Sequence, residues 1–449
     1  MATTKTLAQL KEQAAANQAR STLISLFDED SFTEISPYSG QSAVTGWGQV
    51  EGNLVYAFMQ DISVKSGAIC KAAAQKIVKL YGEAVKNGAP VVGIYDSKGG
   101  DISEGVELLQ AYGEIAKASG ALSGVAPQIS VISGVCGGTA AILASMADFV
   151  VMTEKSELFL TAPFLDANKT EGAGTAKNAA LSGVSCFTEK DTAAAVERAK
   201  ALLSVLPQNN LDTAINCYAS SDAEVKDFSE ITGTADVSGV MELYKDFGKN
   251  SKVYFASSGS DMGKTEGVVY AGDRLSSDDT AKIARFAALC DSFSIPIVTV
   301  LDCEGFEVNS GAELTGSVRS ASKLAQVYAA ATVPKIAAVS KALGGAFNIF
   351  CGANADITIA DETAVIAPST PKSAAIFLYG DKLNSKEELE KAANDYAAEE
   401  ASALNAMEKG AVDIITEKEN FWSEAQRALE ALDSKRVQAP ARKHINFVY

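Results

Sequence analysis

The chain has 449 residues, of which 47% are apolar and 21% are charged, as is typical of soluble globular proteins. At about 150 residues per domain, this length predicts two to three domains. The formal net charge of -17 argues against nucleic-acid binding, which needs a basic face. No apolar run approaches the roughly 20 residues that span a bilayer, and the polar start has no signal-peptide core.

The cysteines indicate a reduced, cytoplasmic protein. They form no C-x-x-C pair, and several lie in apolar runs, where a thiol is expected to be a core residue. The four-ligand spacing of a structural zinc site is missing, and the only histidine is His444, so we expect no metal site. The cysteines are Cys70, Cys136, Cys186, Cys217, Cys290, Cys303 and Cys351.

In chain order, the first half begins with a helical segment and then a hairpin over residues 42–60. A helix is predicted over residues 67–86, where apolar residues recur on one face. Residues 91–95, VVGIY, form a short buried strand that ends at Asp96. A second helix is predicted over residues 101–119.

The stretch PQISVISGVCGGTA, residues 127–140, predicts a buried strand, a turn of small residues and the start of an apolar helix. A helix start presents backbone N–H groups without an intrahelical partner, and Gly137 and Gly138 allow another molecule to approach them. The turn is therefore a candidate site for a developing oxyanion, without any catalytic side chain. A lone Gly-Gly turn is more often structural, so the functional interpretation depends on its recurrence.

The same pattern recurs in the second half. A shift of 207 residues places the stretch on PKIAAVSKALGGAF, residues 334–347, so that Gly137 and Gly138 fall on Gly344 and Gly345. One matched turn would be chance. A duplication requires that a second block match at a similar offset.

The preceding helix–strand unit recurs as well, at a shift of 206 residues that places Asp96 on Asp302. Two matched blocks at nearly equal offsets predict an internal duplication, since a fixed long period marks repeated units. The boundary is expected within the polar, turn-rich residues 206–250. We assign residues 1–235 to an N-terminal domain and residues 236–449 to a C-terminal domain.

This series of motifs resembles the carboxyltransferase component of biotin-dependent acyl-CoA carboxylases and decarboxylases, in the crotonase-like superfamily. No single motif is specific, whereas the ordered series in both halves is. The resemblance implies an α/β fold of two duplicated crotonase-like (ClpP/crotonase) domains, each a β-β-α superhelix. The motifs are FDEDSFTEI (27–35), VTGWGQVEGNLVYAFMQD (44–61), GAPVVGIYDSKGGDISEGVELLQAYGEI (88–115), GVAPQISVISGVCGG (124–138), LPQNN (206–210), IARFAALCDSFSIPIVTVLDCEGF (283–306) and KLAQVYAAATVPKIAAVSKALGGAF (323–347).

The resemblance also implies two facing oxyanion holes built from backbone N–H groups. Gly138 and Thr139 match the hole for the thioester oxygen of the acyl-CoA, on the N-terminal side. Gly345 and Ala346 match the hole for carboxybiotin, on the C-terminal side, and the shift of 207 residues pairs these same positions. Asn348 would tune acyl size or cap its helix. The positions expected to bind substrate are Gly137, Gly344, Asn348, Gly99 and Gly100.

The chain departs from the family pattern at several positions. Thr139 stands where the family has a second glycine, which keeps a backbone donor but is bulkier. The loop DSKGGD, residues 96–101, lacks the arginine of the family's Asp-Ser-Gly-Gly-Ala-Arg loop, and Glu304 replaces the proline of its Pro-Gly-Phe turn. The loop after Pro163 lacks the family's Glu-Glu-Leu-Gly-Gly-Ala and its histidine. These departures bear on substrate identity and on activity.

The implied reaction is carboxyl transfer at the carbon next to the thioester of an acyl-CoA, such as acetyl-, malonyl-, propionyl- or methylmalonyl-CoA. Two aimed N–H groups would stabilise the enolate, and biotin would take the proton, so no side-chain base is required. The chain has no biotinylated-lysine motif and no ATP-dependent carboxylation segment, so biotin is expected on a separate biotin carboxyl carrier protein. The resemblance implies biotin carboxylase or membrane decarboxylase subunits as partners, with the chain peripheral to a membrane in the latter case, and a homo-oligomer such as a hexamer.

Several alternatives stay open. The chain would also suit a sodium-pumping acyl-CoA decarboxylase, in which the reaction runs in the other direction. A crotonase-like hydratase or thioester hydrolase would leave one turn idle, and departures that disabled the site would leave a non-catalytic assembly subunit. Asp96 and Asp302 are expected to cap the following loops rather than to be catalytic. Cys136 has no evident basic partner that would make it a nucleophile.

Overall fold

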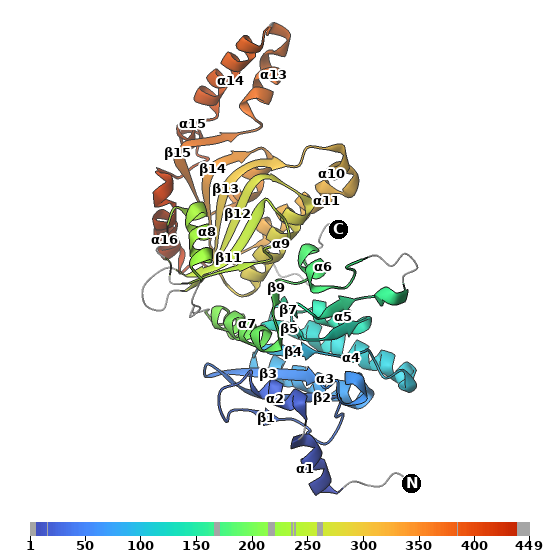
Figure 1. Cartoon of the computed structure of the whole chain (residues 1–449). Helices are drawn as coiled ribbons and strands as arrows, with labels where there is room; N and C mark the ends of the chain where they lie inside the picture. Colours follow the sequence, from blue (N-terminus) through green and yellow to red (C-terminus); the bar gives the residue numbers. More distant parts are fainter. Residues whose placement is uncertain are drawn as a thin grey trace. The chain divides into compact units, whose positions relative to one another are not determined.

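The computed structural model describes residues 6–15, 17–165, 171–213, 221–234, 237, 239–257, 264–383 and 385–437. The chain divides into two compact units, Met1–Ile215 and Asn216–Tyr449 (Figure 1). The division falls earlier in the chain than residue 235, because helix α8 (Asp222–Thr232) packs on strand β10 (Gly239–Leu243) of the second unit. None of the helices in the described ranges is both long and apolar enough to cross a membrane.

The strands of the first unit are β1 (Thr33–Glu34), β2 (Ala43–Val50), β3 (Asn53–Gln60), β4 (Val91–Tyr95), β5 (Gln128–Ile132), β6 (Val135–Gly137), β7 (Phe149–Thr153), β8 (Glu157–Phe159) and β9 (Phe187–Glu189). The main sheet has the order β1-β2-β3-β4-β5-β7-β9. Strands β1 to β3 pair antiparallel, and each later neighbour is parallel. Strands β6 and β8 form a small parallel sheet of their own.

The helices of the first unit follow the apolar periodicity of the sequence. Helix α3 buries Ile77 and Leu80 and ends at Gly88, which has φ 56°. The helix expected from residue 101 begins only after Gly105, because this glycine has φ 55° and separates a single short turn from α4. The helices are α1 (Leu7–Ala15), α2 (Gln18–Ile24), α3 (Lys71–Asn87), α4 (Val106–Leu122), α5 (Thr139–Ser145), α6 (Ala176–Leu181) and α7 (Thr192–Val205).

The second unit has a main sheet of the same type. Its strands are β10, β11 (Ser251–Ser257), β12 (Thr265–Leu275), β13 (Ile297–Phe306), β14 (Lys335–Leu343), β15 (Ile357–Ala367) and β16 (Ile414–Thr416), in that order across the sheet. Strands β10 to β12 pair antiparallel, and the remaining neighbours are parallel. The pairing directions across the two main sheets are therefore the same.

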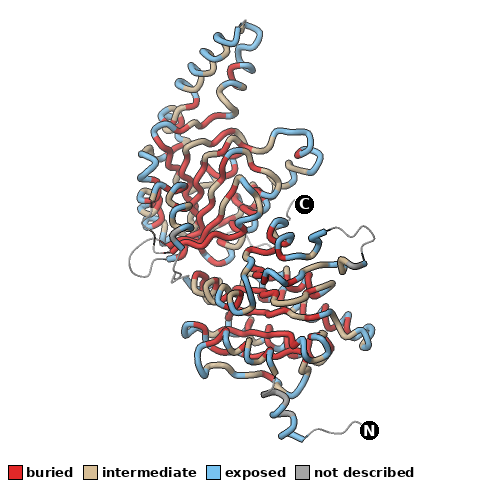
Figure 2. Tube along the Cα trace, viewed as in Figure 1, coloured by how far each residue is buried: buried red, intermediate tan, exposed pale blue. Residues whose placement is uncertain are grey.

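Most helices of the second unit pack on this sheet or on one another, and one helical hairpin stands apart. Helices α13 and α14 project from the sheet, and Figure 2 shows that most of their surface is exposed. The core includes Phe228, whose ring meets those of Tyr254 and Trp422 edge-on. The helices after α8 are α9 (Ser277–Ser292), α10 (Ser310–Thr315), α11 (Ser317–Ala330), α12 (Gly345–Phe350), α13 (Pro371–Tyr379), α14 (Lys386–Glu400), α15 (Ala403–Glu408) and α16 (Phe421–Leu432).

A pair of buried lysines repeats between the units. Lys76 on α3 and Lys282 on α9 are 4% and 2% exposed, and the shift of 206 residues pairs them. The Lys76 ammonium donates to the carbonyl oxygen of Ala43 at 2.7 Å, and the Lys282 ammonium donates to that of Gly248 at 2.7 Å. Each lysine thus ties a helix to a segment that leads into the antiparallel part of its sheet. With the matching pairing of the strands, this confirms the predicted duplication.

Candidate active site

The turn between strand β6 and helix α5 forms the candidate site of the first unit. Gly138 has φ 64°, a conformation that favours glycine, and its N–H donates to the carbonyl oxygen of Phe159 at 2.8 Å. A Cβ atom at Gly137 would lie 2.5 Å from the ring of the same phenylalanine. The path of the turn past strand β8 therefore requires both glycines.

The turn between strand β14 and helix α12 repeats this geometry in the second unit. Gly344 has φ 53°, and its N–H donates to the carbonyl oxygen of Ala367 at 2.9 Å. Gly345 is the first residue of α12, and a Cβ atom there would lie 2.9 Å from the ring of Phe306. In both units a glycine with positive φ precedes a short helix and bonds to the neighbouring strand.

The structure corrects the residue pairing of the two turns. Within strands β5 and β14 the shift of 207 residues holds, because Ile129 and Ile336 take the same place against β7 and β15. At the turns the shift is 206 residues, because Gly138 and Gly344 share their conformation and their hydrogen bond. The pairing of Gly138 with Gly345, expected from a uniform shift, is therefore wrong by one residue.

A single missing residue explains this change of register. Ser133 and Gly134 separate β5 from β6, whereas only Ser340 lies between Val339 and Lys341, where the pairing of β14 shifts. The first residue of α5 consequently takes the place of the first residue of α12. A comparison of the two halves without gaps does not show such a deletion when sequence identity is low.

Hydrogen bonding within the fold limits which N–H groups are available to a ligand. The N–H groups of Gly138 and Gly344 already donate to backbone carbonyls. Those of Thr139, Gly345 and Ala346 belong to the first turn of a helix, where the helix supplies no acceptor. Three of the four predicted donors thus remain candidates, and Gly138 has a structural bond that sequence reasoning did not show.

A glycine segment at the end of the preceding strand, which we call the glycine loop, also repeats between the units; in the second unit it is the last part of strand β13. Gly99 and Gly305, which the shift of 206 residues pairs, have φ 126° and 104°. The Ser97 hydroxyl accepts from the N–H of Gly99 at 3.0 Å and donates to its carbonyl oxygen at 2.8 Å. The Cys303 thiol makes the same two contacts with Gly305, at 3.3 and 3.4 Å. Sequence reasoning missed Ser97 and Cys303, although the shift that aligned their neighbours, both aspartates, aligns them too.

Each glycine loop lies beside the glycine turn of its own unit. In the first unit the N–H of Ser97 donates to the carbonyl oxygen of Val135 at 2.7 Å, which joins the loop to strand β6. In the second unit strand pairing places Asp302 opposite Lys341, and Phe306 packs against the turn. The predicted substrate-binding residues of the first unit, on the loop and on the turn, are thus brought together.

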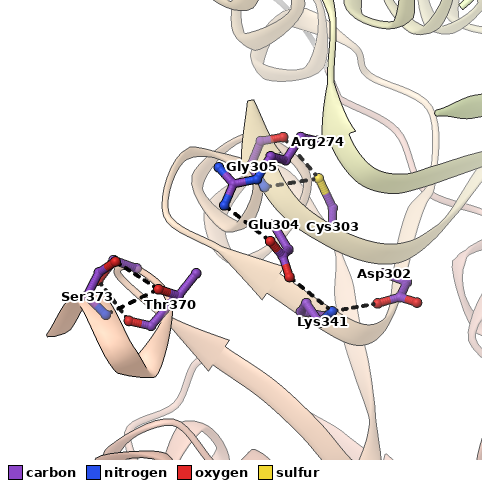
Figure 3. Close-up of polar contacts among 9 residues, drawn as sticks. Arg274, Asp302, Cys303, Glu304, Gly305, Lys341, Thr370 and Ser373 are labelled. Carbon is purple, nitrogen blue, oxygen red and sulfur yellow. Dashed lines mark hydrogen bonds and ion pairs between the residues drawn. The ribbon is translucent and has the colours of Figure 1, made fainter. Parts of the chain in front are cut away.

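The two aspartates at the strand ends have different surroundings. Burial raises the pKa of Asp96, although its carboxylate also accepts from the backbone of Val135, which lowers it. A Cβ atom at Gly134 would lie 2.0 Å from Asp96 Oδ1, so this carboxylate packs directly on the backbone before β6. These contacts fit the expected role in holding a loop. Asp302 instead forms an ion pair with Lys341 at 3.5 Å (Figure 3).

Asn348 lies inside helix α12 and is exposed. Because the helix begins at Gly345, directly after Gly344, the Asn348 side chain does not cap it. Its backbone carbonyl accepts from the side chain of Asn354 at 2.9 Å. This position excludes the capping role, and the role in tuning acyl size stays a prediction.

The cysteines described by the structure are buried and form no disulfide: Cys70, Cys136, Cys186, Cys290, Cys303 and Cys351. Burial raises the pKa of Cys136, next to the first turn, to about 12, which disfavours the thiolate that a nucleophile requires. Cys217 and His444 lie outside the described residues. Within those residues, no three or more His, Cys, Asp or Glu side chains are grouped as metal ligands.

Comparison with known proteins identifies the family. A family model described as Carboxyl transferase domain matches residues 18–447. The chain is 33% identical over 480 residues to the propionyl-CoA carboxylase beta chain of Cereibacter sphaeroides, covering 95% of this chain and 93% of the relative. It is 32% identical over 493 residues to the methylmalonyl-CoA decarboxylase subunit alpha of Propionigenium modestum, covering 98% and 95%. The chain therefore belongs to the carboxyl transferase family.

A solved structure agrees with this assignment. The fold matches transcarboxylase 12S, crystallised with methylmalonyl-coenzyme A and methylmalonic acid bound, with a TM-score of 0.90 and 28% identity over 100% of both chains. The predicted α/β architecture of two duplicated crotonase-like domains is confirmed. The resemblance to carboxyltransferase subunits of biotin-dependent enzymes is confirmed as well.

Proposed function

We propose that the protein moves a carboxyl group between an acyl-CoA and biotin held on a separate carrier protein. The observation that carries this proposal is the duplicated site, in which each unit pairs a glycine loop with a glycine turn. Relatives that align over more than nine-tenths of both chains are named for propionyl-CoA and methylmalonyl-CoA. This supports an acyl-CoA of that size as the substrate.

In the first unit, backbone N–H groups would hold the thioester oxygen of the acyl-CoA. Thr139 would supply one donor, and Gly100, which follows the bonded Gly99, would supply another. A Cβ atom at Gly99 or at Gly138 would meet no described atom within 4 Å, so there is open space at the loop and at the turn. As the neighbouring carbon loses its proton, charge builds on the thioester oxygen, and one aimed donor is worth roughly 10²–10³ in rate.

In the second unit, the N–H groups of Gly345 and Ala346 would hold an oxygen of the biotin ureido or carboxyl group. Of the described atoms, only the carbonyl oxygen of Leu343 lies within 4 Å of a Cβ atom built on Gly305, at 3.6 Å, so the loop leaves room for a planar group. Biotin, when bound, supplies the carboxyl group and the base. The protein's own residues bind and orient the two reactants, which accounts for much of the rate in such reactions.

A decarboxylase complex is the second candidate. It is favoured by the 32% identity to a methylmalonyl-CoA decarboxylase subunit alpha, over 98% of this chain. The same two holes would serve the reverse direction of carboxyl transfer. The partners would then be membrane decarboxylase subunits and the biotin carrier, in place of biotin carboxylase and the carrier. In either case the chain would work in the cytoplasm, and it would be peripheral to the membrane in the decarboxylase complex.

Exposed apolar side chains after both glycine loops support a homo-oligomer. Ile102 and Val308, paired by the shift of 206 residues, are 88% and 79% exposed, and Leu109 and Leu314 lie close to them in sequence. Large exposed apolar residues beside a site are typical of contact surfaces. We expect a second copy of the chain to cover them. Transcarboxylase 12S, which has the same fold, assembles as a hexamer.

The function is tested by mixing the purified protein with methylmalonyl-CoA, with or without free biotin. Loss of the acyl-CoA that requires biotin is the expected result. Equal turnover without biotin would indicate a hydratase or hydrolase instead. CoA binding without turnover, in the presence of the biotin carrier, would indicate a non-catalytic assembly subunit. Malonyl-CoA, tested in parallel, reports the acyl size.

A further inference from the structure

Two bulges interrupt the second sheet near the carboxyl ends of β13 and β14, where the candidate site lies. Between β12 and β13, Arg274 pairs with Gly305, so that Glu304 is left without a partner residue. Between β13 and β14, Ser340 is the residue left out. A bulge disrupts the ladder of hydrogen bonds and bends the strand. The ladder resumes beyond each bulge, because Arg274 pairs with Gly305 and Lys341 pairs with Asp302, so the interruptions are confined to Glu304 and Ser340.

Glu304, which has no partner residue in the backbone ladder, forms ion pairs through its side chain with both neighbouring strands. Its Oε2 lies 3.2 Å from the Arg274 guanidinium on β12, and its Oε1 lies 3.5 Å from Lys341 Nζ on β14. Lys341 Nζ also lies 3.5 Å from Asp302 Oδ1. Figure 3 shows Glu304 between the two cations. We call these four side chains the ion cluster; it links three strands where the ladder is interrupted.

The ion cluster is moderately exposed, which limits its strength. The side chains of Arg274, Glu304 and Lys341 are between 34% and 38% exposed, and that of Asp302 is 48% exposed. Pairs at this exposure are partly screened by water and contribute little to global stability. We therefore expect the ion cluster to affect how well the glycine loop is ordered, and not the stability of the whole unit.

The first unit secures the equivalent loop in a different way. At the shift of 206 residues, Lys98 takes the place of Glu304, and Val135 takes the place of Lys341. The N–H of Lys98 donates to the carbonyl oxygen of Ser66 at 3.1 Å, and Val135 accepts a further backbone bond from the loop. Backbone pairing also holds the second loop, since Gly305 pairs with Arg274 and Cys303 pairs with Ala342. The charged bridge between strands is the difference, because Val135 stands in the first unit where Lys341 stands in the second.

We propose that Glu304 is a positioning residue of the second unit's candidate site. By binding Arg274 and Lys341, it fixes the loop of Gly305 against the strand that leads to Gly344. Because that strand runs directly into the proposed N–H donors, the separation between loop and donors depends on Glu304. The expected effect on turnover rests on the proposed function, whereas the effect on loop order rests on the geometry alone.

Hydrogen exchange of the backbone amides tests the effect on loop order. Glu304→Gln removes the charge and keeps the size of the side chain. Glu307→Gln is the matched control, since Glu307 lies on the same loop and forms no ion pair in the described structure. Amides of residues 303–306 and 341–345 are expected to exchange about fivefold faster in Glu304→Gln only. Exchange at the wild-type rate in that variant would overturn the proposal.

Turnover tests the consequence for the site. Glu304→Gln is expected to lower kcat for biotin-dependent loss of methylmalonyl-CoA about fivefold, with unchanged acyl-CoA binding. Lys341→Met should add little to this loss, because both changes break the same contact. Losses that multiply would contradict a shared role. If the wild-type protein shows no biotin-dependent turnover, the proposed function fails, and hydrogen exchange still decides whether Glu304 positions the loop.

Discussion

Gly138 and Gly344 take the same place in the two units. They lie 206 residues apart, have φ 64° and 53°, and donate their N–H groups to the neighbouring strand at 2.8 and 2.9 Å. These bonds fix where each short helix begins. The next N–H, of Thr139 or of Gly345, is therefore the first that helical geometry leaves without an acceptor.

Thr139→Pro tests the donor proposed in the first unit. Thr139 is the first residue of α5, a position that accommodates proline well, so the fold is expected to persist without this N–H. Biotin-dependent turnover of methylmalonyl-CoA is expected to fall about 100-fold. Thr139→Ala keeps the N–H and should stay close to the wild-type rate. An equal loss in both variants would show that the threonine side chain matters instead.

Gly345→Pro makes the corresponding test in the second unit. Both Gly345→Pro and its control Gly345→Ala place a Cβ atom 2.9 Å from the Phe306 ring, but only proline removes the N–H. Turnover is expected to be about 100-fold lower in the proline variant than in the alanine variant. Acyl-CoA binding, measured by calorimetry, should be unchanged in both. Equal turnover in the two variants would remove Gly345 from the set of donors.

The two turn glycines are expected to differ in how well they tolerate a side chain. Alanine is strained at either φ, at a cost of about 1–2 kcal/mol. At Gly344 its Cβ would also lie 3.0 Å from the carbonyl oxygen of Pro368, whereas at Gly138 no described atom lies within 4 Å. Urea titrations should therefore show a larger loss of stability for Gly344→Ala than for Gly138→Ala. The opposite order would contradict the close approach of Pro368 to the second turn.

Lys282 is expected to make stability depend on pH. Burial lowers its pKa from the ordinary value of 10.5 to about 8, although Asp279 and Glu242 act in the other direction. Between these two values the unfolded state binds more protons, so the free energy of unfolding rises with pH. In Lys282→Met this slope should be smaller by up to about 1.4 kcal/mol per pH unit. Urea titrations from pH 8 to pH 10 measure the slope, and an unchanged slope would contradict the lowered pKa.

Local signals in the sequence predicted most of the fold. The hairpin expected over residues 42–60 is β2 and β3, joined through Glu51 and Gly52, which both have the positive φ of a tight turn. The helical pattern placed the helices because each buries one face, and short continuous apolar runs placed central strands such as β4, which is buried along its whole length. The duplication was visible because both halves keep the order of these elements.

The details of the site depend on contacts that sequence patterns do not contain. The bond from Gly138 to Phe159 joins residues on different strands, and it decides which N–H groups are occupied. The second unit has one residue, Ser340, where the first has two, Ser133 and Gly134, and this deletion became apparent only from strand pairing. Arg274 and Glu304 lie on separate strands, and a bulge brings their side chains together.

Transfer of a labelled carboxyl group tests the central claim most directly. The protein is incubated with methylmalonyl-CoA labelled in its free carboxyl group and with a biotinylated carrier protein, and the label on the carrier is followed by mass spectrometry. We predict that the carrier gains the label only when the wild-type protein is present, and far more slowly with Thr139→Pro. Loss of the acyl-CoA at the same rate without the carrier, with no label on biotin, would contradict carboxyl transfer.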